Sequence, residues 1–339
     1  HGKVAREMWQ EVWPDHNVAH VPISSMTNIV HIPTWVAGEI HNIFDKYLGP
    51  SWLDDHDSST IWQRLGEAPD SEIWEVHLAL KRKLISYLRE RVRRRWVNGS
   101  NDPTQVLTSG TLLDPEALTI GFARRFATYK RATLIFRDLE RLQRILLDIH
   151  RPVQIIFAGK AHPADEPGKS LIQHIYNLAK HNQLGGRIAF IEDYDMHMAR
   201  YLTQGVDVWL NNPRRPREAS GTSGMKAAIN GIPNLSILDG WWVEGYNGAN
   251  GWAIGDEREF DNQDAQDGFD ANHIYQLLED EIVPLYYSRD RDGIPRGWVE
   301  IMRESIRSNA PMFGTRRMIK EYTNELYVNE MQESETTAV

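Results

Sequence analysis

The chain has 339 residues, a net charge of −9, 41% apolar residues and 25% charged residues, which is ordinary for a globular protein with a large core. The acidic balance, without a long basic run, argues against nucleic acid as the main partner, and no apolar run is long enough to cross a membrane. The chain has no cysteine, which excludes disulfides and thiolate chemistry and favours a cytoplasmic enzyme. It begins at His1 without an initiator methionine, so we expect a piece of a longer protein.

Residues 1–115 are expected to form a helical and loop-rich segment. One stretch within it has apolar side chains four residues apart, a spacing typical of an amphipathic helix: Val76, Leu80, Leu84, Leu88, Val92 and Trp96. The arginines and lysines of this stretch could form a binding patch, but a solvated helix face is the better interpretation. Residues 98–103 (NGSNDP) are expected to form a loop.

From residue 116 the sequence alternates between short apolar strands and helices. Strands are expected within residues 116–124, 152–161, 186–194, 206–212 and 234–240, and helices within 130–150, 169–181, 196–204 and 216–233. This alternation predicts a right-handed, doubly wound parallel sheet of the Rossmann type, in which ligands bind beyond the carboxyl ends of the strands. After residue 270 the pattern is helical, and the polar tail 329–339 is expected to fray.

Four cations follow the first predicted strand within eight residues: Arg124, Arg125, Lys130 and Arg131. Arginine forks beside a helix start are suited to binding phosphate. The alternative, a solvated helix start with unrelated charges, carries equal weight when this segment is considered alone.

The segment 216–233 (PREASGTSGMKAAINGIP) places a lysine, Lys226, close behind a run of small residues. It fits a short helix capped by Thr222 or Ser223 and ended by Gly231, with backbone N–H groups free to bind an anion. The positive field of that site should lower the pKa of Lys226 and favour its reaction with a carbonyl. Pyridoxal phosphate needs both features, although without other evidence a surface lysine on a capped helix would explain most such segments.

A third segment, residues 191–199 (IEDYDMHMA), follows a predicted strand and should face the same crevice. Tyr194 could pack on a ring or bind a phosphate, although acidic strand ends are common. Two other motifs do not meet the requirements of the sites they resemble, and no metal site is expected. Residues 159–170 end like a phosphate-binding loop but have Pro163 where that loop needs glycine. His16 and His20 lie in a loop-like stretch without the context of a metal-binding helix.

Together, four stretches resemble the glycogen/starch (α-glucan) phosphorylase family, in its bacterial and archaeal branch. They are HGKVAREMW at the start, MTNIVHIPTW at 26–35, RRFATYKR at 124–131, and EASGTSGMK with NGIPNLSILDGWWVE at 218–244. The resemblance covers residues 1 to about 310 and implies the C-terminal half of a GT-B glycosyltransferase fold, with the N-terminal domain absent. The implied domains are a bridging segment 1–115, a Rossmann-like domain 116–310 that binds cofactor and phosphate, and a C-terminal helix with a frayed tail, 311–339.

The resemblance implies a role for each matching residue. Lys226 would be the cofactor lysine, and the other cofactor contacts would be Arg124, Lys130, Thr222, Tyr194 and Trp35. Arg125 and Lys130 would hold the substrate phosphate and count, with Lys226, as the catalytic set. The glucosyl hydroxyls would contact Asn28, Glu218, Ser220 and Gly221. Two departures from the family pattern are Ile29, where the family has glycine, and Ser223-Gly224, where the animal enzymes have Gly-Asn.

The implied reaction is reversible phosphorolysis, in which the end of an α-1,4-glucan and phosphate give glucose 1-phosphate with pyridoxal 5'-phosphate as cofactor. Two alternatives remain open. A sugar-nucleotide-dependent GT-B transferase, such as a glycogen synthase-like enzyme, shares the fold but has no need of Lys226. A non-catalytic glucan-binding protein needs none of the cations. A homo-oligomer is compatible with the sequence.

Overall fold

The computed structural model describes residues 2–97, 108–180, 184, 186–256, 258 and 260–337. The loop expected at 98–103 lies outside the described residues. Six strands form one sheet, entirely parallel, in the order β3-β2-β1-β4-β5-β6. The strands are β1 (Leu118–Ala123), β2 (Val153–Ala158), β3 (Ile188–Ile191), β4 (Val208–Asn211), β5 (Asn234–Ile237) and β6 (Gly251–Ile254). This is the order of the doubly wound Rossmann sheet, so the predicted fold class is confirmed.

The central strands are apolar because both of their faces are covered. Every residue of β1, β2, β3, β4 and β5 is buried. Ile120 in β1 pairs in register with Ile155 of β2 on one side and with Val208 of β4 on the other. Such continuous apolar runs are typical of parallel sheets and explain why five strands could be predicted. The sixth strand, β6, was missed because it has only four residues and begins with glycine, so its sequence is hard to tell from that of a loop.

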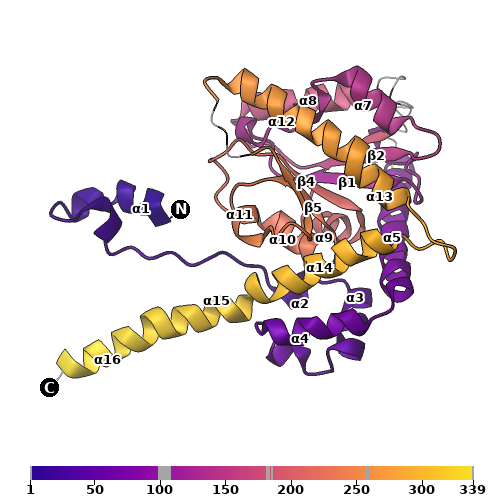
Figure 1. The fold of residues 1–339 in the computed structure, drawn as a ribbon. Helices are drawn as coiled ribbons and strands as arrows, with labels where there is room; N and C mark the ends of the chain where they lie inside the picture. Colours follow the sequence, from indigo (N-terminus) through magenta and orange to yellow (C-terminus); the bar gives the residue numbers. More distant parts are fainter. Residues whose placement is uncertain are drawn as a thin grey trace.

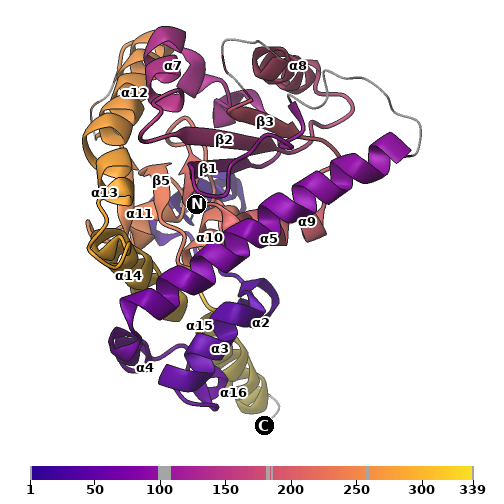
Figure 2. The ribbon, with the colours of Figure 1, turned by 90° about the vertical axis from the view of Figure 1, so that its right-hand side faces the viewer.

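Helices cover the two faces of the sheet (Figure 2). One face carries α7 (Leu139–Leu146), α8 (Glu166–Lys180) and α12 (Gln263–Leu277). The other carries α5 (Asp70–Val97), α9 (Met196–Gly205) and α10 (Thr222–Ala228). The predicted amphipathic spacing in α5 is confirmed, since Leu80, Leu84 and Leu88 are all buried.

A buried charge pair fixes α5 against the amino ends of β1 and β4. Lys81 Nζ donates to Asp207 Oδ2 at 2.5 Å and to the carbonyl oxygen of Ala117 at 2.6 Å, and His77 contacts the other oxygen of Asp207 at 2.6 Å. Burial lowers the pKa of Lys81, and the neighbouring Lys81 and His77 hold the pKa of Asp207 below its usual value. These contacts lie at the amino end of the sheet, so the carboxyl end stays available for a site.

One predicted helix begins later than expected. The stretch 130–150 is helical only in α7, and residues 128–136 form two short 3₁₀ turns instead. Arg131 causes the interruption, because its backbone is left-handed with φ of 48°. Asp138 then starts α7 by accepting a hydrogen bond from the N–H of Arg141 at 2.9 Å, as an N-cap residue does.

Most of the remaining helices lie in the N-terminal and C-terminal parts of the chain, and α11 lies between β5 and β6. They are α1 (Gly2–Met8), α2 (Ile32–Trp35), α3 (Gly38–Tyr47), α4 (Ser59–Gln63), α11 (Trp242–Gly245), α13 (Val283–Tyr287), α14 (Arg296–Met312), α15 (Thr315–Tyr322) and α16 (Val328–Thr337). The tail continues as helix to Thr337, whereas an irregular end was expected. Both α1 and α16 project away from the sheet (Figure 1). No helix of the described ranges is long and apolar enough to cross a membrane.

The projecting ends carry exposed apolar side chains. On and beside α1 these are Val4, Met8, Trp9 and Val12, and on the C-terminal helices Ile319, Leu326, Tyr327, Val328 and Met331. In the sheet domain the exposed large apolar side chains are scattered over separate loops and helices, for example Leu112, Ile149 and Met196. Exposed apolar side chains gathered on two projecting segments are typical of surfaces that pack against another body of protein.

Candidate active site

The predicted site residues gather where the strand order reverses. β1 and β4 are neighbours at the centre of the sheet, and successive strands are added outward from them in opposite directions. Loops that leave two such strands separate and open a crevice at their carboxyl ends, where ligands bind in doubly wound sheets. The loop after β1 carries residues 124–130, and the loop after β4 carries residues 212–221.

A compact charge cluster joins these two loops. Glu218 forms an ion pair with Arg124, and its Oε2 lies 3.8 Å from Lys130 Nζ. All three side chains are nearly buried, being 5% to 11% exposed. Among the described residues, the Nε and Nη1 atoms of Arg124 are buried without a hydrogen-bond partner. Two cations against one carboxylate, with unused buried donors, leave this cluster able to accept an anion.

Lys130 has an altered acid–base property. Burial, reinforced by Arg124, lowers its pKa to about 8, while Glu218 opposes the shift. Its amine is therefore charged at neutral pH but close to losing its proton. Arg125, next in the chain to Arg124, is exposed and forms no ion pair within the described residues. Its guanidinium lies beside the phenol of Tyr129, whose pKa is raised mainly by burial.

Arg131 does not belong to the anion site, which corrects the predicted four-cation cluster. Its buried guanidinium donates to Asp267 at 2.8 Å and to Asp270 at 2.7 Å, both on α12. It also donates to the carbonyl oxygens of Asn212 and Pro213. Because its donors are already occupied by protein acceptors, Arg131 has a structural role.

Lys226 lies in the last turn of α10, facing an aromatic ring. The helix begins at Thr222 after Gly221, whose φ of 86° requires glycine, so the expected capping by Thr222 or Ser223 is wrong. Lys226 Nζ lies 3.6 Å from the centroid of the Trp35 ring and makes no hydrogen bond or ion pair with any described residue. Its pKa is lowered, as predicted, but the cause is burial and not a field at the helix start.

Asn230 fixes the lysine and the ring relative to each other, and sequence reasoning missed it. Its buried side-chain amide donates to the carbonyl oxygens of Lys226 at 2.8 Å and of Trp35 at 2.9 Å. Its Oδ1 accepts from the N–H of Ala37 at 2.8 Å. The hydrogen bonds of this amide thus go to the two segments that bear Lys226 and Trp35. No sequence pattern predicted that Asn230 would join these segments.

The loop that follows β5 supports the segment 218–221. Asp239 accepts a hydrogen bond from the N–H of Glu218 at 2.8 Å, and the N–H of Trp241 donates to the carbonyl oxygen of Ser220 at 2.8 Å. Burial, with the nearby charge of Glu218, raises the pKa of Asp239. A Cβ at Gly224 would lie 2.7 Å from Trp241 Nε1, so glycine is required there. Asp239 also follows a strand, a signal that could have identified it from the sequence.

Asn28 and Ser220 line a shared cavity of about 290 Å³. Its other lining residues are Gly2, Ser25, Met26, Thr27, Ala219, Met225, Trp241 and Glu244. Thr27 donates a hydrogen bond to Glu244, which joins the Asn28 segment to α11. The side chain of Asn28 accepts from the N–H of Ile29 at 2.9 Å, and neither residue has a positive φ. Isoleucine at position 29 is therefore compatible with the loop.

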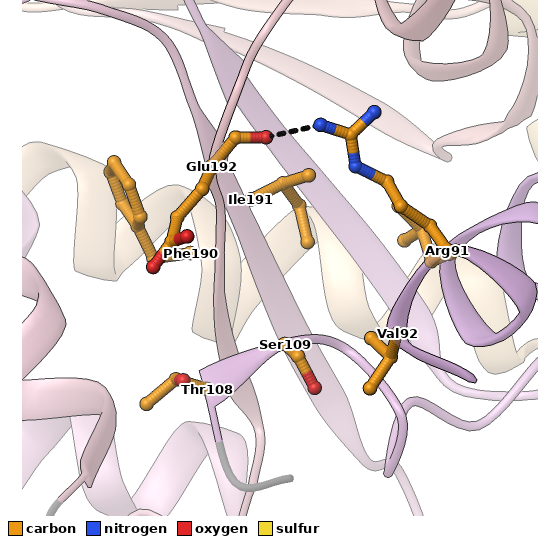
Figure 3. A pocket seen from close by; sticks show the side chains of 8 residues that line it. Arg91, Val92, Thr108, Ser109, Phe190, Ile191 and Glu192 are labelled. Carbon is orange, nitrogen blue, oxygen red and sulfur yellow. Dashed lines mark hydrogen bonds between the residues drawn. The ribbon is translucent and has the colours of Figure 1, made fainter. Parts of the chain in front are cut away.

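Tyr194 lies apart from these contacts. Its hydroxyl makes no hydrogen bond within the described part of the chain, and its ring packs against the apolar cluster of α5 and α9. Burial raises its pKa to about 12, so the phenol stays protonated. A second hollow, at the end of β3, has a volume of only about 30 Å³ and is lined by Arg91, Glu192 and their neighbours (Figure 3). It is the size of a water molecule and contains none of the predicted site residues.

Comparison with known proteins identifies the family. The family described as "Phosphorylase: Carbohydrate phosphorylase" matches residues 20–276, which include every predicted site residue. The chain belongs to the carbohydrate phosphorylase family. The predicted resemblance is confirmed, and with it the interpretation of the sheet as one Rossmann-like half of a GT-B fold.

Several members of the family are similar over nearly the whole chain. Glycogen phosphorylase of Aquifex aeolicus is 50% identical over 334 residues, which is 98% of this chain and 47% of that protein. Maltodextrin phosphorylase of Thermococcus litoralis is 47% identical over 328 residues, 96% of this chain and 38% of that protein. Glycogen phosphorylase of Mycobacterium tuberculosis is 42% identical over 338 residues, 100% of this chain and 39% of that protein. The chain therefore spans less than half the length of these phosphorylases.

Proposed function

We propose that the protein containing this chain is an α-glucan phosphorylase, which cleaves the non-reducing end of an α-1,4-glucan with phosphate and releases glucose 1-phosphate. The observation that supports this most strongly is the convergence of Arg124, Lys130 and Glu218 at the centre of the sheet, with Lys226 nearby in sequence on α10. Anion-binding cations, a sugar-binding carboxylate and a reactive amine are the groups that this reaction needs.

The chain's own residues fit pyridoxal 5'-phosphate as the cofactor. Lys226 has a partly buried amine of lowered pKa, free of any hydrogen bond within the described residues, which suits attachment to an aldehyde. Arg124 has buried donors that find no partner in the part of the chain that the structure describes, and such donors suit a phosphate. Lys130 and Thr222 would complete the phosphate contacts, and Trp35 and Tyr194 would lie against the cofactor. In this family the cofactor supplies a phosphate that assists proton transfer.

The substrates would meet at the same crevice. Arg125, exposed and without an ion pair among the described residues, and Lys130 would hold the attacking phosphate. Glu218, Ser220, Gly221 and Asn28 would bind the glucosyl hydroxyls. Cleavage develops positive charge on the sugar ring, so a phosphate held beside that ring stabilises the transition state and attacks the same centre.

We further propose that residues 1–115 bridge to the other half of the protein, that 116–310 bind cofactor and phosphate, and that 311–339 form a C-terminal arm. The projecting apolar side chains of α1 and of the arm support this division. The protein would act in the cytoplasm on glucan or maltodextrin, as a monomer or a homo-oligomer.

A sugar-nucleotide-dependent glucosyltransferase on the same fold is the main alternative. Such an enzyme has no need of an unpaired amine at position 226. The absorbance spectrum of the purified full-length protein separates the two functions, because bound pyridoxal phosphate adds a near-ultraviolet band that borohydride shifts. A protein that lacks this band and transfers glucose from a sugar nucleotide would refute the proposal. A non-catalytic glucan-binding protein would show neither activity.

Residues 1–339 alone are expected to fold but not to catalyse phosphorolysis. GT-B sites lie between two domains, and this chain supplies one wall of the cleft, so water would reach the reacting groups. The test is to measure glucose 1-phosphate release by this chain and by the full-length protein, with hydrogen exchange as the control for folding. We expect slow exchange in the sheet and fast exchange in residues 2–29, because the segment that follows is held in the core by buried side chains such as Ile32, Phe44 and Trp52. Turnover by the chain near that of the full-length protein would show that one wall is sufficient.

Anion binding to the cofactor-free chain is expected to weaken above pH 8. Lys130, whose pKa is about 8, is charged below that pH and neutral above it, so its attraction for an anion is lost as the pH rises. Sulfate is the appropriate probe because its own charge is constant over this range. Calorimetric titration at pH 6.5 and pH 9.5 should show tighter binding at the lower pH. Lys130→Arg should remove the difference, and an unchanged pH dependence in this variant would exclude Lys130 as its source.

A further inference from the structure

Two acidic residues on α12 face the loops that carry the candidate site. Asp267 and Asp270 are three residues apart and so lie on the same side of the helix. Asp267 uses one oxygen for each of two arginines: Oδ1 accepts from Arg131 at 2.8 Å, and Oδ2 accepts from Arg214 at 2.8 Å. Asp270 accepts from the same Nη1 of Arg131 at 2.7 Å. The helix therefore holds both arginines at once.

Each arginine in turn ties the loop after β1 to the loop after β4. Arg131 belongs to the first loop and donates to the carbonyl oxygens of Asn212 and Pro213 in the second, both at 2.9 Å. The side chain of Asn212 returns a hydrogen bond to the carbonyl oxygen of Arg131 at 2.9 Å. Arg214 belongs to the second loop, and its N–H donates to the carbonyl oxygen of Tyr129 in the first at 2.7 Å.

The linkage stands directly beside the groups proposed to act on substrate. Lys130 immediately precedes Arg131 in the chain, and Glu218 follows Arg214 by four residues. The left-handed backbone of Arg131, with φ of 48°, is unfavourable for a residue with a side chain and persists only where its surroundings determine it. Its four guanidinium contacts supply that constraint. A shift of either loop would change the separation of Lys130 and Glu218.

We propose that Asp267 is a positioning residue for phosphorolysis, which holds the Lys130 loop and the Glu218 loop in register through Arg131 and Arg214. The inference rests on the proposed function of the same site. Asp267 contacts neither Lys130 nor Glu218 through any hydrogen bond in the described residues, so it acts through the two arginines. A displacement of about 1 Å in reacting groups can lower turnover by about a hundredfold.

The experiment uses the full-length protein and a matched pair of substitutions on α12. Asp267→Asn removes the charge that joins the two arginines, while Arg131 keeps Asp270. Asp264→Asn is the control, because Asp264 lies on the same helix, is 85% exposed and, of the described residues, forms an ion pair only with Arg137. Arg214→Gln breaks the linkage from the other side, and the double variant Asp267→Asn with Arg214→Gln tests coupling. Asp267→Glu keeps the carboxylate charge that pairs with both arginines. For each variant kcat, the KM for phosphate and the urea midpoint are measured.

Asp267→Asn and Arg214→Gln should each lower kcat by about 10- to 100-fold, with the KM for phosphate changed by less than about threefold. The double variant should lose no more than the worse single variant, because both break one linkage. Asp267→Glu should recover most of the turnover, and Asp264→Asn should match the wild type. If Asp267→Asn fails to fold, the values of kcat for Arg214→Gln and Asp267→Glu test the proposal instead.

Three results would overturn the proposal. One is turnover in Asp267→Asn equal to that in Asp264→Asn. Another is a lowered urea midpoint with unchanged kcat in the folded enzyme, which would show a role in stability alone. The last is strict additivity in the double variant. Phosphorolysis by the wild type under the same conditions separates these results from a failure of the proposed function, since an inactive wild type would refute that function first.

Discussion

Replacing Lys226 with alanine in the full-length protein is expected to abolish retention of pyridoxal phosphate and to lower phosphorolysis at least about a thousandfold, which corresponds to about 4 kcal/mol. Lys226 is the proposed point of attachment, and its amine lies 3.6 Å from the Trp35 ring centroid with a pKa lowered by burial. Other contacts to the cofactor would be non-covalent. Without the lysine, dialysis should remove the cofactor, and its absorbance band should disappear.

Borohydride reduction followed by peptide mapping locates the attachment in the wild type. The labelled peptide should contain Lys226 and no other modified lysine. Lys169→Ala is the matched control, because Lys169 is half-exposed and pairs with Glu166 on α8. This control should keep both cofactor and activity. Label on another lysine, or full cofactor retention by Lys226→Ala, would contradict the assignment.

Replacing Arg125 with alanine is expected to cost about 3 kcal/mol of transition-state stabilisation, which lowers kcat/KM for phosphate more than a hundredfold. Arg125 is exposed at the carboxyl end of β1 and forms no ion pair within the described residues, so its guanidinium is available to a phosphate. Its loss removes a charge-assisted fork, and the neighbouring Arg124 cannot replace it because Arg124 is buried against Glu218 and its remaining donors are proposed to bind the cofactor phosphate.

The control for this substitution is Arg151→Ala. Arg151 lies just before β2, at the opposite end of the sheet, and pairs with Asp148. Initial rates over a range of phosphate concentrations, in both variants, give the comparison. Arg125→Lys should recover part of the activity, since it keeps the charge but not the fork. Unchanged phosphate kinetics in Arg125→Ala would show that Arg125 does not bind the substrate phosphate.

The sheet could be predicted from the sequence because its strands are buried on both faces. Continuous apolar runs such as those of β1 and β2 are visible in any sequence, and alternation with helices leaves one main topology. β6 was missed because four residues carry too little pattern, and α7 was placed too early because the left-handed conformation of Arg131 has no sequence signal. That conformation depends on contacts with α12, more than 130 residues later in the chain.

The candidate site could be predicted only as far as it lies on strand ends. Arg124 and Lys130 were expected after the first strand and Glu218 in the loop of a later one, and the structure brings the three side chains together. The residues that hold them were missed, because their function depends on tertiary contacts: Asn230 bridges Lys226 and Trp35, and Asp239 holds the backbone of Glu218. The lowered pKa of Lys226 was predicted in direction but not in cause, since burial of a side chain on a short helix cannot be derived from the sequence of that helix.

The reaction itself is the most direct test of the proposed function. The full-length protein, loaded with pyridoxal phosphate, is incubated with a linear α-1,4-glucan with and without inorganic phosphate, and in a parallel reaction with a sugar nucleotide. The proposal predicts glucose 1-phosphate only when phosphate is present, its reincorporation into glucan when the reaction is reversed, and no transfer from the sugar nucleotide. Glucosyl transfer from the sugar nucleotide, with no glucose 1-phosphate formed from glucan and phosphate, would contradict it.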